Sequence, residues 1–221
     1  MKSLLVVLLA AGSLSLSAGI KGTKHDLSAS GAGAKYTTTQ VCVFCHAPHN
    51  AATGTNVLAN QPLWNRNAYT TTAPTFIPYT SATLVQVAGQ PTGASLACFT
   101  CHDGTSSVGQ LINMPTGGLG TLTGSTNVDA TTGHLLNAPA LGVDLSNDHP
   151  VTITYDTSAA MVPSKLNAVT GTGTTANVGG LPLFSGKVEC ASCHSVHDNT
   201  IAPFLRMTMT NSQLCTTCHV K

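Results

Sequence analysis

All eight cysteines of the 221-residue chain lie in one repeated pattern, in which two residues separate a cysteine pair and a histidine follows directly. The four copies read CVFCH, CFTCH, CASCH and CTTCH. Their residues are Cys42, Cys45 and His46; Cys98, Cys101 and His102; Cys190, Cys193 and His194; and Cys215, Cys218 and His219. Any fold of this chain must therefore accommodate four copies of this cysteine–histidine unit.

Three chemistries suit paired cysteines. Eight cysteines could form four disulfides in an exported protein, and C-x-x-C units could hold structural zinc ions. Neither needs a histidine after every second cysteine. Covalent attachment of c-type haem does need it, because the thiols add to the haem vinyl groups while the histidine ligates the iron. The sequence therefore predicts four covalently attached haem c groups, with the four motif histidines as proximal iron ligands.

The composition leaves few large side chains with which to fill a core. Charged residues make up 8% of the chain and aromatic residues 5%, whereas about 25% of residues are charged in typical soluble domains. Long stretches rich in Thr, Gly, Ser and Asn join the motifs and favour turns. We therefore expect a mostly irregular fold with few short helices and strands, a multihaem cytochrome c organised around four stacked haems.

Local patterns place a few short elements in this irregular chain. We expect helices around residues 93–103 and 211–220, where a motif histidine closes a helical turn, and strands within residues 83–89 and 151–156. The motifs recur without a fixed period, which indicates one domain organised by its haems. A boundary in the Gly-rich stretch 117–124 is the alternative.

The first residues have the pattern of a secretory signal. Lys2 precedes an apolar run and then small residues, so we expect residues 1–19 to be a signal peptide and residues 20–221 to form the tetrahaem cytochrome c domain. No segment approaches the roughly 20 apolar residues of a membrane span. The formal net charge of +1 argues against a nucleic-acid partner, which would require clustered Lys and Arg.

Five further histidines exceed the four distal positions on the irons, so every haem could have two histidine ligands. His49 and His197 each follow a motif histidine by three residues, and we expect each to ligate a haem other than its own motif's. The predicted distal ligands are His25, His49, His149 and His197, and His134 is surplus. Which of the five is the non-ligand stays open. Two histidines saturate an iron, which suits electron transfer rather than substrate binding.

These motifs resemble a known family. CVFCHAPHN, the later CASCHSVH and the intervening DHPV are similar to multihaem cytochromes with a doubled CxxCH motif. Four such sites, with GTKHDLS near the start, most resemble the OmcE-type extracellular tetrahaem cytochromes. The resemblance implies a mostly coil fold around a row of stacked haems. It also implies polymerisation into an extracellular filament, in which one distal histidine comes from the neighbouring subunit, and export of respiratory electrons to external acceptors.

The sequence thus predicts an electron carrier rather than an enzyme. We expect a secreted subunit of an electron-conducting filament, whose partners are copies of itself and other redox proteins or extracellular electron acceptors. At the subunit junction we expect His49 to ligate the haem attached at Cys190 and Cys193. Scarce charge favours a filament over a diffusing carrier, since diffusing carriers use charge to steer encounters. The alternatives are a monomeric periplasmic electron shuttle and, less favoured, a multihaem reductase with one open haem.

Overall fold

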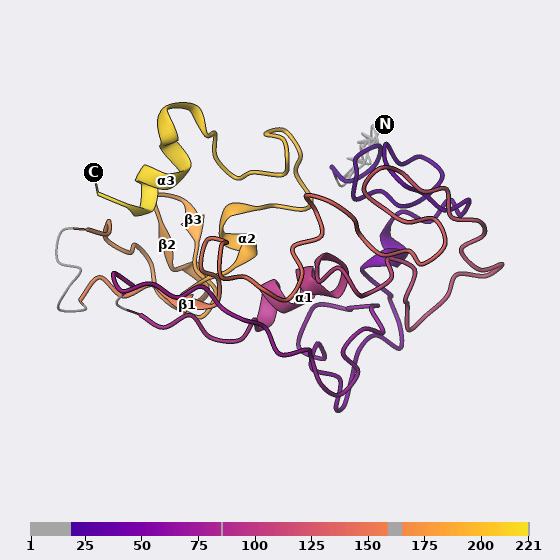
Figure 1. Ribbon diagram of the computed structural model, residues 1–221, viewed down its shortest axis with the longest axis horizontal. Helices are drawn as coiled ribbons and strands as arrows, with labels where there is room; N and C mark the ends of the chain where they lie inside the picture. Colours follow the sequence, from indigo (N-terminus) through magenta and orange to yellow (C-terminus); the bar gives the residue numbers. More distant parts are fainter. Residues whose placement is uncertain (1–18, 85, 159–164, 221) are drawn as a thin grey trace, which may run out of the picture.

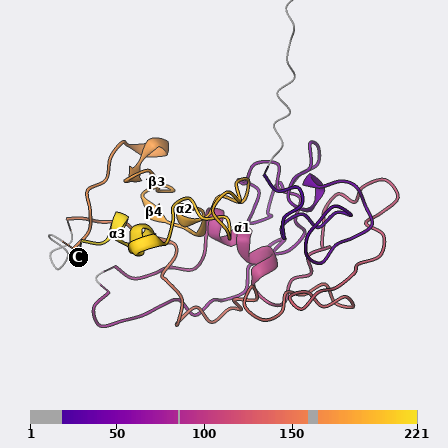
Figure 2. The same ribbon diagram turned by 90° about the horizontal axis from the view of Figure 1, so that it is seen from above.

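The computed structural model describes residues 19–84, 86–158 and 165–220. The predicted signal peptide lies outside these residues, apart from Gly19. Turns, bends and extended loops make up most of the described chain and connect a few short elements (Figure 1 and Figure 2). The mostly irregular fold predicted from the sequence is confirmed. The molecule is elongated, with the first described residues toward one end and the C-terminus at the other (Figure 1).

Each haem motif lies on a helical turn. The first occupies the 3-10 turn η1 (Cys42–Phe44), and the second ends the longest helix, α1 (Gly93–His102). The third spans α2 (Cys190–Cys193), and the fourth lies on α3 (Gln213–Cys218). Two further 3-10 turns are η2 (Gly173–Thr175) and η3 (Thr210–Ser212). The helices expected around the second and fourth motifs are therefore confirmed.

The strands form two small antiparallel pairs. Strand β1 (Ile153–Thr154) pairs with β4 (Lys187–Val188), and β2 (Asn177–Val178) pairs with β3 (Leu181–Pro182). The first pair fastens the chain just before α2 to the segment after His149. The strand expected within residues 151–156 is confirmed as β1.

The strand expected within residues 83–89 is wrong for the described part of that stretch, 83–84 and 86–89. Its apolar pattern is only partly covered, since Val87 is 84% exposed whereas Ala88 is buried. A strand is stabilised by pairing with neighbouring strands as well as by packing against a core, and the described part of this segment pairs with no strand. Among the described residues, no helix is long and apolar enough to cross a membrane.

The apolar core is divided into small clusters rather than joined in one. The largest contains seven buried residues: Ala52, Leu58, Phe76, Leu96, Ala97, Phe99 and Leu145. Three smaller clusters surround Tyr155, Val108 and Phe44. Ordinary domains form one contiguous core, so the division agrees with an interior that large apolar groups would complete. The arrangement around four haems stays a prediction.

A buried arginine fixes the loop that follows α1. Arg66 is 1% exposed, and its guanidinium donates to the carbonyl oxygens of Val108 (2.7 Å), Thr100 (2.8 Å) and Ser107 (2.6 Å). Charge-assisted bonds of this kind are stronger than neutral ones, and the planar guanidinium can serve several acceptors at once. The loop is thereby tied to the helix that carries the second motif.

Candidate haem sites

The backbone of each motif is closed by one hydrogen bond. In the first, third and fourth motifs, the histidine N–H donates to the carbonyl of the first cysteine, at 2.9, 3.0 and 2.9 Å. The second motif lies within the regular turns of α1. Because residues three apart on a helical turn share one face, the two thiols of a motif can reach the same group. The local fold therefore suits attachment of one haem per motif.

All eight cysteines are free thiols. Within residues 19–84, 86–158 and 165–220, no three His, Cys, Asp or Glu side chains converge as a metal cluster would.

Three motif histidines are oriented by backbone carbonyl groups of prolines. Their Nδ1 atoms lie at hydrogen-bond distance from these oxygens: His46–Pro62 at 2.8 Å, His102–Pro139 at 2.7 Å and His194–Pro203 at 3.1 Å. Metal-ligating histidines characteristically donate their second ring N–H in this way, which fixes the tautomer and leaves Nε2 for the metal. Sequence reasoning missed these prolines, because the carbonyl group of any residue can accept such a bond and no local pattern marks them.

Three motif histidines also lie opposite one of the five spare histidines. The ring centroids are 6.1 Å apart in His46–His197, 6.1 Å in His25–His102 and 6.4 Å in His149–His219. A metal–imidazole nitrogen bond of about 2.0–2.1 Å, with the centroid roughly 1.1 Å beyond the nitrogen, places two rings on one metal about 6.3 Å apart. The observed spacings fit a metal held between the rings.

The neighbourhood of His25 also fits a ligand. Its ring stacks on Phe204 with centroids 4.4 Å apart, and its buried Nδ1 has no hydrogen-bond partner. Burial, followed by the nearby His102 and His194 rings, lowers the pKa of His25 to about 4. Neutral imidazole is the form that binds metals, so this site holds the ring in the ligating state.

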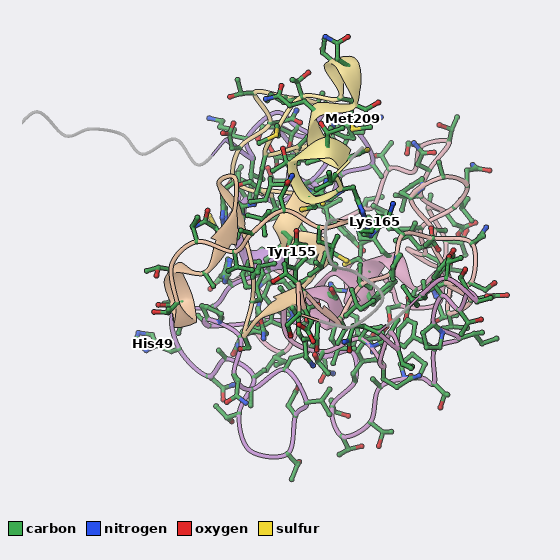
Figure 3. The ribbon with its side chains drawn as sticks, turned by 90° about the vertical axis from the view of Figure 1, so that its left-hand side faces the viewer. His49, Tyr155, Lys165 and Met209 are labelled. Atoms are coloured by element: carbon green, nitrogen blue, oxygen red, sulfur yellow. The ribbon has the colours of Figure 1, made fainter. Side chains whose placement is uncertain are left out.

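No ring contact involves His194, His49 or His134 in the part of the chain that the structure describes. His194 nevertheless lies close enough to His25 and His102 to lower the pKa of each of these two rings. His49 is exposed, and Figure 3 shows its side chain at the periphery of the molecule, pointing away from the ribbon. His134 is half-buried in a turn, where its carbonyl accepts the N–H of Asp129 at 3.0 Å. The structure therefore pairs three of the four predicted distal histidines with a motif histidine and leaves His49 apart.

A large cavity joins the third and fourth motifs. Its volume is about 630 Å³, and its walls include both cysteines and the histidine of each motif, together with His149. The remaining wall is largely apolar, with Leu145, Ile153, Leu181 and Leu183 among its side chains. Cofactor sites are typically concave and mostly apolar, and a porphyrin requires such a wall.

Consecutive motifs are also neighbours in space. Burial, followed by the adjacent Cys101 thiol, raises the pKa of Cys45 to about 12, so the first motif lies beside the second. The thiols of Cys98 and Cys190 are hydrogen-bonded, which joins the second motif to the third. The shared cavity joins the third to the fourth. The sites therefore follow one another in their order along the chain.

Comparison with known proteins agrees with this chemistry. A family model described as the doubled CXXCH motif matches residues 182–221, which contain the third and fourth motifs. No curated protein matches the chain. This match supports the doubled CxxCH motif and does not support the more specific resemblance to OmcE-type cytochromes. It points to a multihaem c-type cytochrome that acts in electron transfer, with haem c bound covalently at C-x-x-C-H sites.

Proposed function

We propose that this chain is a tetrahaem electron carrier whose subunits polymerise end to end into a secreted, electron-conducting filament. The observation that carries the proposal is the pairing of the histidines. Three motif histidines have a second ring at metal-bridging distance within the chain, whereas His194 has none among the described residues and His49 lies exposed.

Bis-histidine ligation accounts for the three pairs. His197, His25 and His149 would each close the second face of the iron ligated by His46, His102 and His219, respectively. An iron closed on both faces exchanges electrons and does not bind substrate, which supports a carrier over the reductase alternative. When bound, the haems supply the one-electron iron couple. The chain's own groups hold the ligands: the carbonyls of Pro62, Pro139 and Pro203 orient the proximal rings.

The haem site of the third motif, at His194, has no second ring at metal-bridging distance among the described residues. A histidine from a neighbouring subunit would supply this ring, and His49 is the exposed candidate. A contact in which one surface of a subunit meets a different surface of the next repeats without closing, and so builds an open filament. One iron–imidazole bond per junction would also set the register between subunits.

The loop that carries His49 is already ordered. The side chain of Asn50 donates to Asn113 Oδ1 at 3.0 Å, and Asn113 returns a bond to the carbonyl of Asn50 at 2.7 Å. Asn113 is itself bonded to the fully buried Asn65 through its N–H (2.8 Å) and its side-chain amide (2.9 Å). A ligand loop held in this way loses little conformational freedom on binding, which supports a role at a junction.

His49→Ala tests the proposal, with His134→Ala as the matched control. The first variant should keep four haems by intact mass but contain one high-spin, carbon-monoxide-binding haem per subunit, and electron microscopy of the secreted fraction should show short filaments or none. The control should be indistinguishable from the wild type. Because ligation needs neutral imidazole, acid should also weaken wild-type filaments.

Normal filaments from His49→Ala, with all haems six-coordinate, would contradict the junction. A wild-type protein found only as a monomer in the periplasm would favour the shuttle alternative.

A further inference from the structure

We propose that Glu189 is a redox-linked protonation site, whose carboxylate takes up a proton when the haem attached at Cys190 and Cys193 takes up an electron. The inference rests on haem attachment at the third motif, and not on the filament. No step of the function proposed above uses this side chain, although it is among the most deeply buried acids of the described chain.

The position of Glu189 places its carboxylate beside the haem site. The residue directly precedes Cys190, is 3% exposed and belongs to the wall of the cavity that also contains Cys193 and His194. At the start of α2, the backbone N–H of Glu189 donates a hydrogen bond to Ser192 Oγ at 3.0 Å. Because the backbone is held at this point, the carboxylate stays next to the attachment site.

Two hydroxyl groups from other parts of the chain hold this carboxylate. Ser95 of α1 and Thr152, which precedes β1, both donate to Glu189 Oε2, the latter at 3.0 Å. Ser95 Oγ also accepts the backbone N–H of Cys190 at 3.0 Å. A hydroxyl group can either donate or accept a hydrogen bond. The site can therefore satisfy both the ionised and the protonated carboxyl without moving the backbone.

Opposing influences act on the charge state of Glu189, and burial is the largest of them. Burial raises its pKa, while the hydroxyl groups of Ser95 and Thr152 and the positive charge of Lys187 on β4 oppose this shift. The other titratable neighbour is Cys190, which is hydrogen-bonded to Cys98 of α1. Attachment of haem converts both thiols to thioethers, which do not titrate. Once haem is attached, Lys187 is the neighbour of Glu189 named here that still carries a titratable charge.

Reduction of the haem would raise the pKa of Glu189 further. It adds one electron to the haem, and a nearby negative charge favours the neutral form of a carboxyl group. One proton from solvent would then bind to the Glu189 carboxylate for each electron received from a neighbouring haem or an electrode. Because the coupling is reciprocal, protonation of Glu189 makes reduction of that haem more favourable.

Glu189→Gln removes the titrating group and keeps its shape, and Asp144→Asn is the control at an exposed acid. In the wild type, reduction should produce a carboxylic acid carbonyl band in the infrared difference spectrum, and the band should shift in D2O. The midpoint potential of one haem should also fall as pH rises, by up to about 59 mV per pH unit, which is the one-electron equivalent of a tenfold change in proton concentration. Glu189→Gln should lose both signals, and Asp144→Asn should keep them.

A band and a pH slope that persist in Glu189→Gln would overturn the proposal and assign the proton to the haem propionates. Thr152→Val supplies a second test that does not depend on folding of the first variant. It removes one donor to the carboxylate and should move the pH-dependent region to higher pH; an unmoved region would also overturn the proposal. Intact mass separates failure of haem attachment from failure of the protonation proposal. A wild-type chain lacking haem at Cys190 and Cys193 would contradict the attachment itself.

Discussion

The imidazole rings of His46 and His197, from distant parts of the chain, lie with their centroids 6.1 Å apart and their planes within 22° of parallel. The segment that begins with the third motif thereby reaches the first. We expected His197 to serve a haem other than that of His194, and its ring neighbour in the structure is His46.

The first prediction follows from this pair. His197→Ala should leave the haem at Cys42 and Cys45 attached but without its distal ligand, so a high-spin band and carbon monoxide binding should appear for one haem in four. Val196→Ala, at the exposed adjacent position, should give an unchanged low-spin spectrum. A low-spin His197→Ala protein that does not bind carbon monoxide would show that another group ligates this iron.

The second prediction concerns the angle between ring planes. The His25 and His102 rings are 82° apart, in contrast to the nearly parallel His46 and His197 rings. Perpendicular axial imidazoles leave the two iron dπ orbitals close in energy, which gives a low-spin electron paramagnetic resonance signal with a large maximum g value. Parallel rings give an ordinary rhombic signal. The oxidised protein should show both kinds, and His25→Ala should remove a large-g component while the rhombic signal of the first haem stays.

The third prediction concerns the largest apolar cluster. Phe99 is 1% exposed on α1 and packs against Phe76 with ring centroids 4.6 Å apart, whereas Phe184 is 36% exposed. Phe99→Ala should lower the free energy of unfolding by about 3–5 kcal/mol, measured by denaturant titration of the haem-loaded protein. Phe184→Ala should cost roughly 1 kcal/mol or less, because surface changes are usually small. Equal losses would mean that the haems, rather than this cluster, determine stability around α1.

The fourth prediction is the effect of Glu189 on stability. Burial is the largest influence on its pKa and raises it, so ionisation is harder in the folded state than in the unfolded state. The stability that the neutral carboxyl contributes is complete below the unfolded pKa of about 4.3 and declines as pH rises through the folded pKa. The free energy of unfolding of Glu189→Gln, measured against the wild type across this range, should therefore improve relatively as pH rises. A difference that is independent of pH would contradict a raised pKa.

Local spacing was enough to predict the helices that carry the second and fourth motifs. Cysteines three apart with a histidine next to them need one helical turn, and a turn is determined by neighbouring residues. The irregular fold was also predictable, since the Thr/Gly-rich linkers cannot bury enough apolar surface for long elements. The expected strand within residues 83–89 failed because its pattern supplies an apolar face but not the partner that the face requires. That partner depends on the path of the whole chain.

The sequence by itself determined the attachment chemistry, the number of motifs and the surplus of histidines, because these depend on residue types and short spacings. The tertiary structure alone decided which ring lies opposite which, as in His149 and His219, and which proline carbonyls orient the motif histidines. It also decided that Glu189 is buried beside Cys190. Such contacts join residues separated by long flexible linkers, and closing those linkers costs only a slowly growing entropy with length. Spacing along the chain therefore does not select the partner, and packing in three dimensions does.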